Sequence, residues 1–148
     1  MSTETLAAIR SSRTFSLVDE ALKRIFDCTA AGIGMAMLSP AYIIIWIAIK
    51  AESRGPAVFR QERIGYKGRA FTIYKFRSMT MDSESDGRPV LCKKDDSRLT
   101  KTGRFLRAHH LDELPQLWNV LRGDMSFVGP RPERRFFIDK IMELNDSY

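Results

Sequence analysis

The feature that most constrains this chain is a stretch of apolar residues that runs from Ile25 to Ile49. At ~1.5 Å of rise per residue, a helix of this length can cross a bilayer core of about 30 Å. Leu17, Ala21 and Leu22 already follow helical spacing upstream, so the helix is expected to begin before the apolar stretch. The length and composition of the stretch favour a helix in contact with a membrane.

Two features of the stretch favour a re-entrant helix, which enters and leaves the membrane on the same face. Ser39 and Pro40 interrupt its middle, where proline bends a helix and the Ser39 hydroxyl can bond back to the preceding turn. Basic residues, which prefer the cytoplasm, flank both ends. A single crossing and a buried helix of a soluble protein stay open as alternatives. The flanking basic residues are Arg10, Arg13, Lys23 and Arg24 before the stretch and Lys50, Arg54, Arg60, Arg63, Lys67 and Arg69 after it.

The chain of 148 residues has room for one compact domain besides this helix. Residues 1–18 are rich in Ser, Thr and Arg and predict a flexible lead-in, residues 19–50 form the re-entrant helix, and residues 51–148 form a cytoplasmic domain. The expected fold class is mainly α with short β strands, in which a re-entrant membrane helix-hairpin precedes a small α/β domain.

Local patterns predict the elements of that domain. Apolar residues at 58–59 and the alternation over 71–76 predict short strands, with a turn between Gly65 and Gly68. Residues 82–98 are expected to form an exposed loop. Helical spacing then predicts helices in residues 100–111, in residues 112–123 with Gly123 as the stop, and in residues 133–144.

The charge balance points to an anionic partner. Lys and Arg number 24 against 18 acidic residues, a formal net charge of +6, which suits phosphate, nucleic acid or an acidic lipid surface. A nucleic-acid binder is disfavoured because the chain lacks an aromatic-basic recognition module. Cys28 and Cys92 are far apart and outside any Cys/His cluster, so they predict free thiols in a reducing compartment.

The adjacent carboxylates Asp112 and Glu113 are the first candidates for chemistry. They come just before Pro115, and proline is tolerated in the first turn of a helix, so the pair is expected near a helix start or a kink. The helix dipole there would keep Asp112 ionised, and an ionised carboxylate can attack phosphorus. Taken alone, such a pair also fits helix capping or a charged surface.

Several basic residues with apolar or turn neighbours could accompany the carboxylate pair. Phosphoryl transfer needs cations to neutralise phosphate oxygens, and the arginine fork binds two oxygens at once. The alternative is that these side chains snorkel to lipid headgroups. His109 and His110 are expected at the surface, because adjacent helical side chains diverge by about 100° and rarely share one metal. The basic candidates are Lys75, Arg77, Arg104, Arg107 and Arg131.

Together these motifs resemble one family. The strings KRIFDCTAAGIGMAMLSPAYIIIWIAIK, GPAVFRQERIGYKGRAFTIYKFRSM and RLTKTGRFLRAHHLDELPQLWNVLRGDMSFVGPRPE occur in this order. They resemble the bacterial sugar transferase family, the small monotopic polyprenyl-phosphate phosphoglycosyl transferases. The resemblance covers roughly residues 18–133 without a large gap.

The resemblance implies a reaction. A nucleotide diphosphate sugar would give its phosphosugar to a polyprenyl phosphate at the cytoplasmic face of the bacterial inner membrane, which initiates exopolysaccharide-type or lipopolysaccharide-type glycan assembly. Asp112 aligns with the nucleophile that forms a covalent phosphosugar intermediate, and Glu113 aligns with a residue that helps to hold Mg²⁺. The implied partners are both substrates and inner-membrane lipid, without nucleic acid, and a homo-oligomer is compatible with them.

The resemblance also extends to the supporting residues. Arg107 aligns with an arginine five residues before the nucleophile, and Lys75 and Arg77 align with the basic residues of a Lys-Phe-Arg motif. The remaining matches are the re-entrant break at Ser39 and Pro40 and the turn formed by Pro130, Arg131 and Pro132.

The sequence departs from the family pattern at two places. His110 stands where the family usually has a small hydroxyl residue, and the chain ends at Tyr148, before the family's Arg-Pro-Gly-x-Thr-Gly-Trp element. The residues 51–148 are therefore expected to form a C-terminally short catalytic domain. The second hypothesis is a truncated, inactive membrane protein that acts as a non-catalytic partner.

Overall fold

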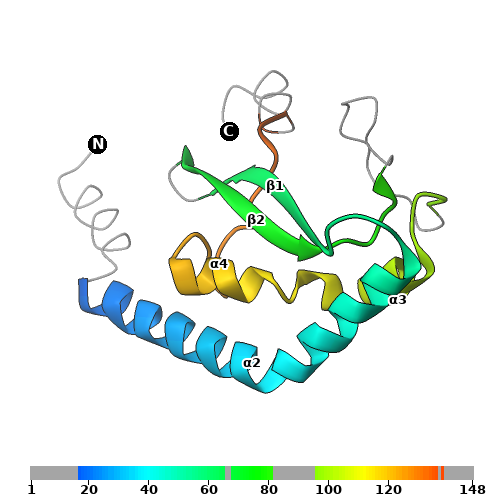
Figure 1. Cartoon of the computed structure of the whole chain (residues 1–148). Helices are drawn as coiled ribbons and strands as arrows, with labels where there is room; N and C mark the ends of the chain where they lie inside the picture. Colours follow the sequence, from blue (N-terminus) through cyan, green and yellow to red (C-terminus); the bar gives the residue numbers. More distant parts are fainter. Residues whose placement is uncertain (1–16, 66–67, 82–95, 137, 139–148) are drawn as a thin grey trace.

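A computed structural model describes residues 17–65, 68–81, 96–136 and 138 of the chain (Figure 1). Helix α2 lies along one side, α3 and α4 lie next to it, and a small sheet lies beyond them. The prediction of a mainly helical chain with short strands is confirmed. The elements are α2 (Leu17–Glu52), β1 (Val58–Ile64), β2 (Ala70–Phe76), α3 (Lys101–Ala108), the 3-10 turn η3 (Leu111–Glu113) and α4 (Gln116–Arg122).

Helix α2 is 36 residues long and contains Pro40. Figure 1 shows it bent in its cyan part, with both arms turned toward the sheet. Pro40 has no N–H for the carbonyl of Ala36, and the Ser39 hydroxyl donates to that oxygen at 2.8 Å. The predicted back-bond of Ser39 is therefore confirmed. The helix bends and continues instead of dividing into separate helices, and its re-entrant position in a membrane stays a prediction.

The outward face of α2 is apolar and exposed. Within the described residues it is the one helix long and apolar enough to cross a membrane, and its apolar window is 11% buried, with a mean hydropathy of 1.9. A core helix of a soluble protein would bury most of this surface, so that alternative is disfavoured. The exposed side chains are Leu22, Ile25, Phe26, Ile33, Met37, Leu38, Ile43, Ile44, Trp46 and Ile47.

A small core joins the C-terminal arm of α2 to β2 and α3. Ile45 and Ile49 pack with Phe76 and Leu106, which are 3% and 1% exposed. Beside them, the Tyr42 hydroxyl donates to the Leu114 carbonyl at 2.5 Å, and its ring lies 5.5 Å from that of Phe76. These contacts fix the chain before and after η3 against the second half of the long helix.

The two strands form an antiparallel pair in which Val58 is opposite Phe76 and Ile64 is opposite Ala70. The predicted strands are confirmed, as is the turn, where the Gly68 N–H donates to the Gly65 carbonyl at 3.2 Å. Residues from the second half of the chain occupy both outer edges of the sheet. On the β1 side, the Ile64 N–H donates to the carbonyl of Glu133 at 2.8 Å.

Asn119 occupies the outer edge of β2. It is 0% exposed, and its side-chain oxygen accepts from the Tyr74 N–H at 3.1 Å. Its amide nitrogen donates to the Thr72 carbonyl at 2.7 Å. Two backbone groups of a strand edge, which would be costly to bury unpaired, are thus satisfied by one side chain from α4.

Two of the three helices predicted after the loop are confirmed, as the shorter α3 and α4. Thr100 caps α3 by accepting the Gly103 N–H at 2.9 Å, and Gly123 ends α4 in the left-handed region with a φ of 88°. Most of the predicted lead-in, of the 82–98 loop and of the 133–144 helix lies outside the described residues. The long helix begins at Leu17 and ends at Glu52, slightly outside the predicted bounds.

Gly103 brings α3 directly against the backbone that follows β2. A Cβ at this position would lie 1.9 Å from the Ser78 carbonyl oxygen, so Gly103→Ala is expected to lower the stability of the protein by about 2 kcal/mol. Gly32→Ala is the matched control, because a Cβ there meets nothing within 4 Å and alanine favours a helix. Thermal unfolding in detergent measures both changes. Equal stability of the two variants would contradict the close approach.

Candidate active site

Asp112 and Glu113 lie in the 3-10 turn between α3 and α4. His110 adopts a left-handed conformation with a φ of 56°, which redirects the chain from α3 into this turn. Pro115 follows as the residue before α4. The predicted location of the pair near a helix start is confirmed, and the turn buries Asp112 to 8% exposure while the Glu113 side chain is 32% exposed.

Burial raises the pKa of the Asp112 carboxyl, and the neighbouring Glu113 raises it further. The positive charges of Lys75 and Arg107 lower it, but the pKa is raised overall. The net direction is opposite to the one expected from a helix start alone, because the 3-10 turn places the side chain away from water. Asp112 therefore takes up a proton more readily than an ordinary aspartate.

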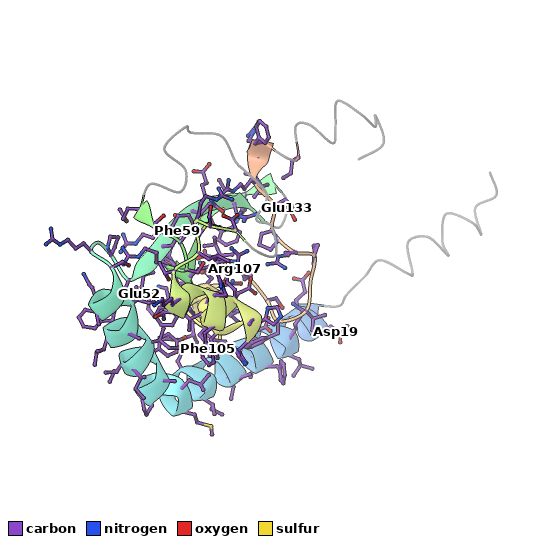
Figure 2. The ribbon with its side chains drawn as sticks, turned by 90° about the vertical axis from the view of Figure 1, so that its right-hand side faces the viewer. Asp19, Glu52, Phe59, Phe105, Arg107 and Glu133 are labelled. Carbon is purple, nitrogen blue, oxygen red and sulfur yellow. The ribbon has the colours of Figure 1, made fainter. Side chains whose placement is uncertain are left out.

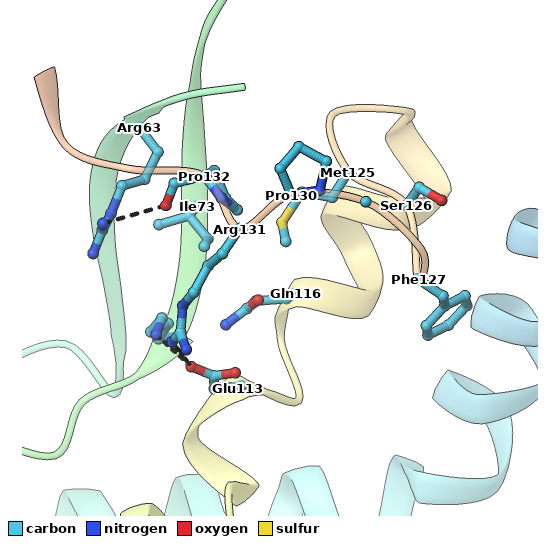
Figure 3. Close-up of a pocket in the computed structure, with 12 residues that line it drawn as sticks. Arg63, Ile73, Glu113, Gln116, Met125, Ser126, Phe127, Pro130, Arg131 and Pro132 are labelled. Carbon is cyan, nitrogen blue, oxygen red and sulfur yellow. Dashed lines mark hydrogen bonds and ion pairs between the residues drawn. The ribbon is translucent and has the colours of Figure 1, made fainter. Parts of the chain in front are cut away.

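Glu113 has the opposite behaviour because two cations hold it. Its Oε1 atom accepts from Lys75 Nζ at 2.7 Å and from Arg131 Nη2 at 2.8 Å (Figure 3). Burial alone would raise the pKa of Glu113, but the hydrogen bond and charge of Lys75 and the charge of Arg131 lower it overall. Two adjacent carboxyls with opposite shifts are suited to different chemical tasks.

A pocket of about 200 Å³ opens beside Glu113. Three cations from separate parts of the chain line it, namely Arg63 on β1, Lys75 on β2 and Arg131 after α4. Gln116 also lines it, and its buried amide nitrogen makes no full hydrogen bond among the described residues, although the Gln116 side chain lies close enough to Glu113 to help lower the pKa of that carboxyl. A pocket with several cations and an unpaired donor is suited to an anion with many oxygens.

The structure brings most of the predicted site residues together. Lys75 and Arg131 reach Glu113, and Pro130 and Pro132 line the same pocket. Arg107 acts on Asp112 through its charge. Arg104 lies exposed on α3, and Ser39 and Pro40 form the bend of α2.

Arg77 is placed elsewhere. Its guanidinium donates to the Arg54 carbonyl at 2.6 Å and to the Ser53 carbonyl at 2.9 Å, at the end of α2. The side chain is 6% exposed. Arg77 thus satisfies carbonyl groups just past the C-terminus of the long helix, and a contact with phosphate stays a prediction.

Other predictions concern possible metal ligands. His109 and His110 are exposed, as expected, and Cys28 is a free thiol, while Cys92 lies outside the described residues. Among the described residues, no group of three or more His, Cys, Asp or Glu side chains comes together.

Sequence reasoning missed Arg63 and Gln116. Arg63 lies opposite Phe71, two positions from the Gln61–Ile73 pair, so it faces the same side of the sheet as Ile73 and Lys75. The register that follows from the turn at Gly65 would have identified it. Gln116 is one helical turn beyond Asp112 and Glu113, a spacing that points to a shared face.

Comparison with known proteins adds independent information. The family described as "Bacterial sugar transferase" matches residues 18–148. A Bacillus subtilis protein, provisionally named as an undecaprenyl-phosphate N-acetylgalactosaminyl 1-phosphate transferase, is 48% identical over 120 residues, which cover 81% of this chain and 66% of that protein.

Two further relatives are UDP-glucose:undecaprenyl-phosphate glucose-1-phosphate transferases. The protein from Caulobacter vibrioides is 51% identical over 111 residues, which cover 74% of this chain and 41% of the relative. The protein from Escherichia coli is 41% identical over 131 residues, which cover 88% of this chain and 28% of the relative. The chain thus spans from about a quarter to about two thirds of the length of these curated relatives.

The opposite pKa shifts predict opposite effects on stability. The ionised form of Asp112 is less favourable in the folded chain than in the unfolded chain, so Asp112→Asn is expected to stabilise the protein at neutral pH. The pKa of Glu113 is lowered, so its contribution is present above the ordinary glutamate pKa and lost as the pH falls through the folded value. Glu113→Gln is expected to cost about 1 kcal/mol at neutral pH.

Thermal unfolding of both variants from about pH 8 down to about pH 2, below the ordinary carboxyl pKa values, tests whether the two substitutions have opposite effects on stability. Both differences from wild type are expected to shrink on acidification, because the wild-type carboxyls then become protonated as well. Destabilisation by Asp112→Asn at neutral pH would contradict the raised pKa.

Proposed function

The chain belongs to the bacterial sugar transferase family, and from this premise we propose that it transfers a phosphosugar from a nucleotide diphosphate sugar to a polyprenyl phosphate. The names of the Caulobacter vibrioides and Escherichia coli relatives favour a UDP-sugar as donor and undecaprenyl phosphate as acceptor, while the Bacillus subtilis relative is named for a different sugar. The observation that carries the proposal is that Glu113, the neighbour of the buried Asp112, meets Lys75 and Arg131 beside a pocket. The product would start a membrane-linked glycan of the exopolysaccharide or lipopolysaccharide type.

Asp112 is the nucleophile in this proposal. A carboxylate oxygen attacks the phosphorus that carries the sugar, a new P–O bond forms, and the bond to the nucleoside monophosphate breaks. In the second step an oxygen of the polyprenyl phosphate attacks the same phosphorus, the Asp112–phosphorus bond breaks, and the carboxylate is regenerated. Burial of Asp112 with the charges of Lys75 and Arg107 nearby supports this role, because a poorly hydrated carboxylate is a stronger nucleophile.

Arg131 and Lys75 neutralise the donor diphosphate. The Arg131 side chain is 73% exposed, so its guanidinium can leave Glu113 for a phosphate with little loss of packing. Lys75 forms an ion pair with Glu113, and its positive charge also acts to lower the pKa of Asp112. Arg63 adds a third cation on the same wall of the pocket. Such an arrangement stabilises charge that develops on phosphate oxygens.

Glu113 would hold Mg²⁺ together with the phosphate oxygens of the donor. The available ligands fit this ion, since Mg²⁺ in such sites commonly takes one or two carboxylates and completes its shell with substrate phosphates and water. Glu113 lines the pocket. When bound, the ion would supply charge neutralisation to the diphosphate and to the departing nucleotide.

We also infer that α2 is re-entrant and that the pocket faces the cytoplasm at the inner membrane. Near one end of α2, Arg24 donates to the Val120 carbonyl at 2.5 Å, and near the other end Ile49 is buried in the core around Phe76. Figure 2 shows α2 curving beneath the other elements, with Asp19 and Glu52 close to its two ends. A straight crossing would carry one of these ends to the opposite membrane face.

The covalent step can be tested directly. We expect a phosphosugar adduct on Asp112 when the folded protein is incubated with Mg²⁺ and labelled UDP-sugars without acceptor, and then analysed by mass spectrometry. Asp112→Asn is the matched control, because it keeps the shape of the side chain and removes the nucleophile. Absence of an adduct with every donor tried would favour the alternative function, a non-catalytic membrane partner.

Gln116 supplies a second test of the donor site. Its buried, unpaired amide nitrogen is expected to donate to an oxygen of the bound donor. Gln116→Met keeps the length and removes the donor, so the KM for the UDP-sugar should rise about tenfold while the protein stays folded. Gln61→Met, on β1 and outside the pocket lining, should leave KM unchanged. An unchanged KM for Gln116→Met would exclude this contact.

A further inference from the structure

Asp27 is a carboxylate within the apolar stretch of α2, and it is 3% exposed. An acidic residue in a membrane-associated helix is costly unless other groups pair with it. One partner lies a hundred residues later in the chain, and the other lies one helical turn before it. The Phe127 N–H donates to Asp27 Oδ1 at 3.3 Å, and Lys23 Nζ lies 3.6 Å from Asp27 Oδ2.

Lys23 extends this contact to a second residue of the same segment. Its ammonium donates to the Ser126 hydroxyl as well as pairing with Asp27. On the same arm of the helix, the rings of Phe26 and Phe127 meet edge to face with centroids 6.5 Å apart. Polar and aromatic contacts thus attach residues 126–127 to the N-terminal arm of α2.

Arg24 holds the chain just before this segment. It donates to the carbonyls of Val120 and Leu121, at 2.5 Å and 2.6 Å, in the last turn of α4. Gly123, with its φ of 88°, leaves room for this approach, since a Cβ there would lie 3.2 Å from Arg24 Nη2. The end of α4 and the segment after it are therefore both fixed to the membrane helix.

The same segment carries a pocket residue. We define the Arg131 loop as residues 124–133. At its start, the Asp124 N–H donates to the Asn119 carbonyl at 3.0 Å, and at its end the carbonyl of Glu133 accepts from Ile64 at 2.8 Å. Between these anchors Arg131 reaches Glu113 at 2.8 Å. The position of the Arg131 guanidinium therefore depends on the conformation of the loop between Asp124 and Glu133 (Figure 3).

We propose that Asp27 is a positioning residue that acts through Arg131. From the membrane helix it fixes Phe127 directly and Ser126 through Lys23, and both residues line the pocket. It thereby sets where the Arg131 loop presents its guanidinium to Glu113 and to a bound diphosphate. The effect on the diphosphate rests on the proposed function. The stabilisation of the Arg131 loop by Asp27 is a property of the fold, and it can be measured without enzymatic activity.

Hydrogen exchange of the full chain in lipid nanodiscs tests the hold on the loop. In Asp27→Ala, amides in the 124–133 segment are expected to exchange about tenfold faster, while those of β1 and β2 stay as in wild type. Asp27→Asn retains an oxygen that can accept from Phe127 and should recover most of the protection. Glu20→Ala removes an exposed acid of the same helix and serves as the matched control.

Unchanged exchange in the 124–133 segment of folded Asp27→Ala would overturn the proposal. Where this variant fails to fold, Ser126→Ala decides in its place, because it removes the hydroxyl that Lys23 contacts. Faster exchange confined to the segment supports the proposal, and exchange equal to wild type overturns it.

Kinetics with UDP-glucose as the probe then test the action through Arg131. Asp27→Ala should raise the KM for the donor about tenfold, and it should add little further in an Arg131→Ala background. Full additivity of the two substitutions would overturn the proposal. If no donor gives product, the proposed function is refuted. If Asp27→Ala still speeds hydrogen exchange in the loop, the stabilisation of the loop by Asp27 stands independently of that function.

Discussion

The missing N–H of Pro40 leaves the Ala36 carbonyl without its helical donor, and the Ser39 hydroxyl supplies one at 2.8 Å. A carbonyl left unpaired at this exposed apolar position would be costly in lipid, because hydrocarbon offers no hydrogen bonds. The bend that results turns both arms of α2 toward the same side. One arm holds Phe76 and Leu106, and the other holds the end of α4, so the small sheet and the site are fixed across the bend.

Lys75 links the two halves of the carboxylate pair. It bonds Glu113 directly and lowers the pKa of Asp112 through its charge, while burial works in the opposite direction on Asp112. Glu113 is thus neutralised by its ion pairs with Lys75 and Arg131, whereas the cations near Asp112 do not offset the effect of its burial. The Asp112 carboxylate is suited to form a bond, and the Glu113 carboxylate is suited to hold cations that a substrate brings.

The local patterns of the sequence predicted the strands, the turn after Gly65, both short helices and the stop at Gly123, because each depends on neighbours within a few residues. The carboxylate pair and Arg131 were also proposed as site residues, Arg131 first from its turn neighbours and then from a family motif. Arg77 could not be placed, since the carbonyls that it caps belong to residues 53–54 and only folding brings them to it. The direction of the Asp112 shift escaped prediction for the same reason, because burial is a property of the whole fold.

The charges near the start of α2 connect membrane topology to the site. Asp27 and Arg24 would each cost about 3 kcal/mol at the centre of a membrane-spanning helix. In the bent helix both are paired instead, Asp27 with Phe127 and Lys23, and Arg24 with the last carbonyls of α4. A straight helix that separated from α4 would lose these partners and release the Arg131 loop in the same movement. In the proposed re-entrant arrangement, the contacts of Asp27 and Arg24 that tie α2 to the end of α4 and to Phe127 would therefore also hold the Arg131 loop.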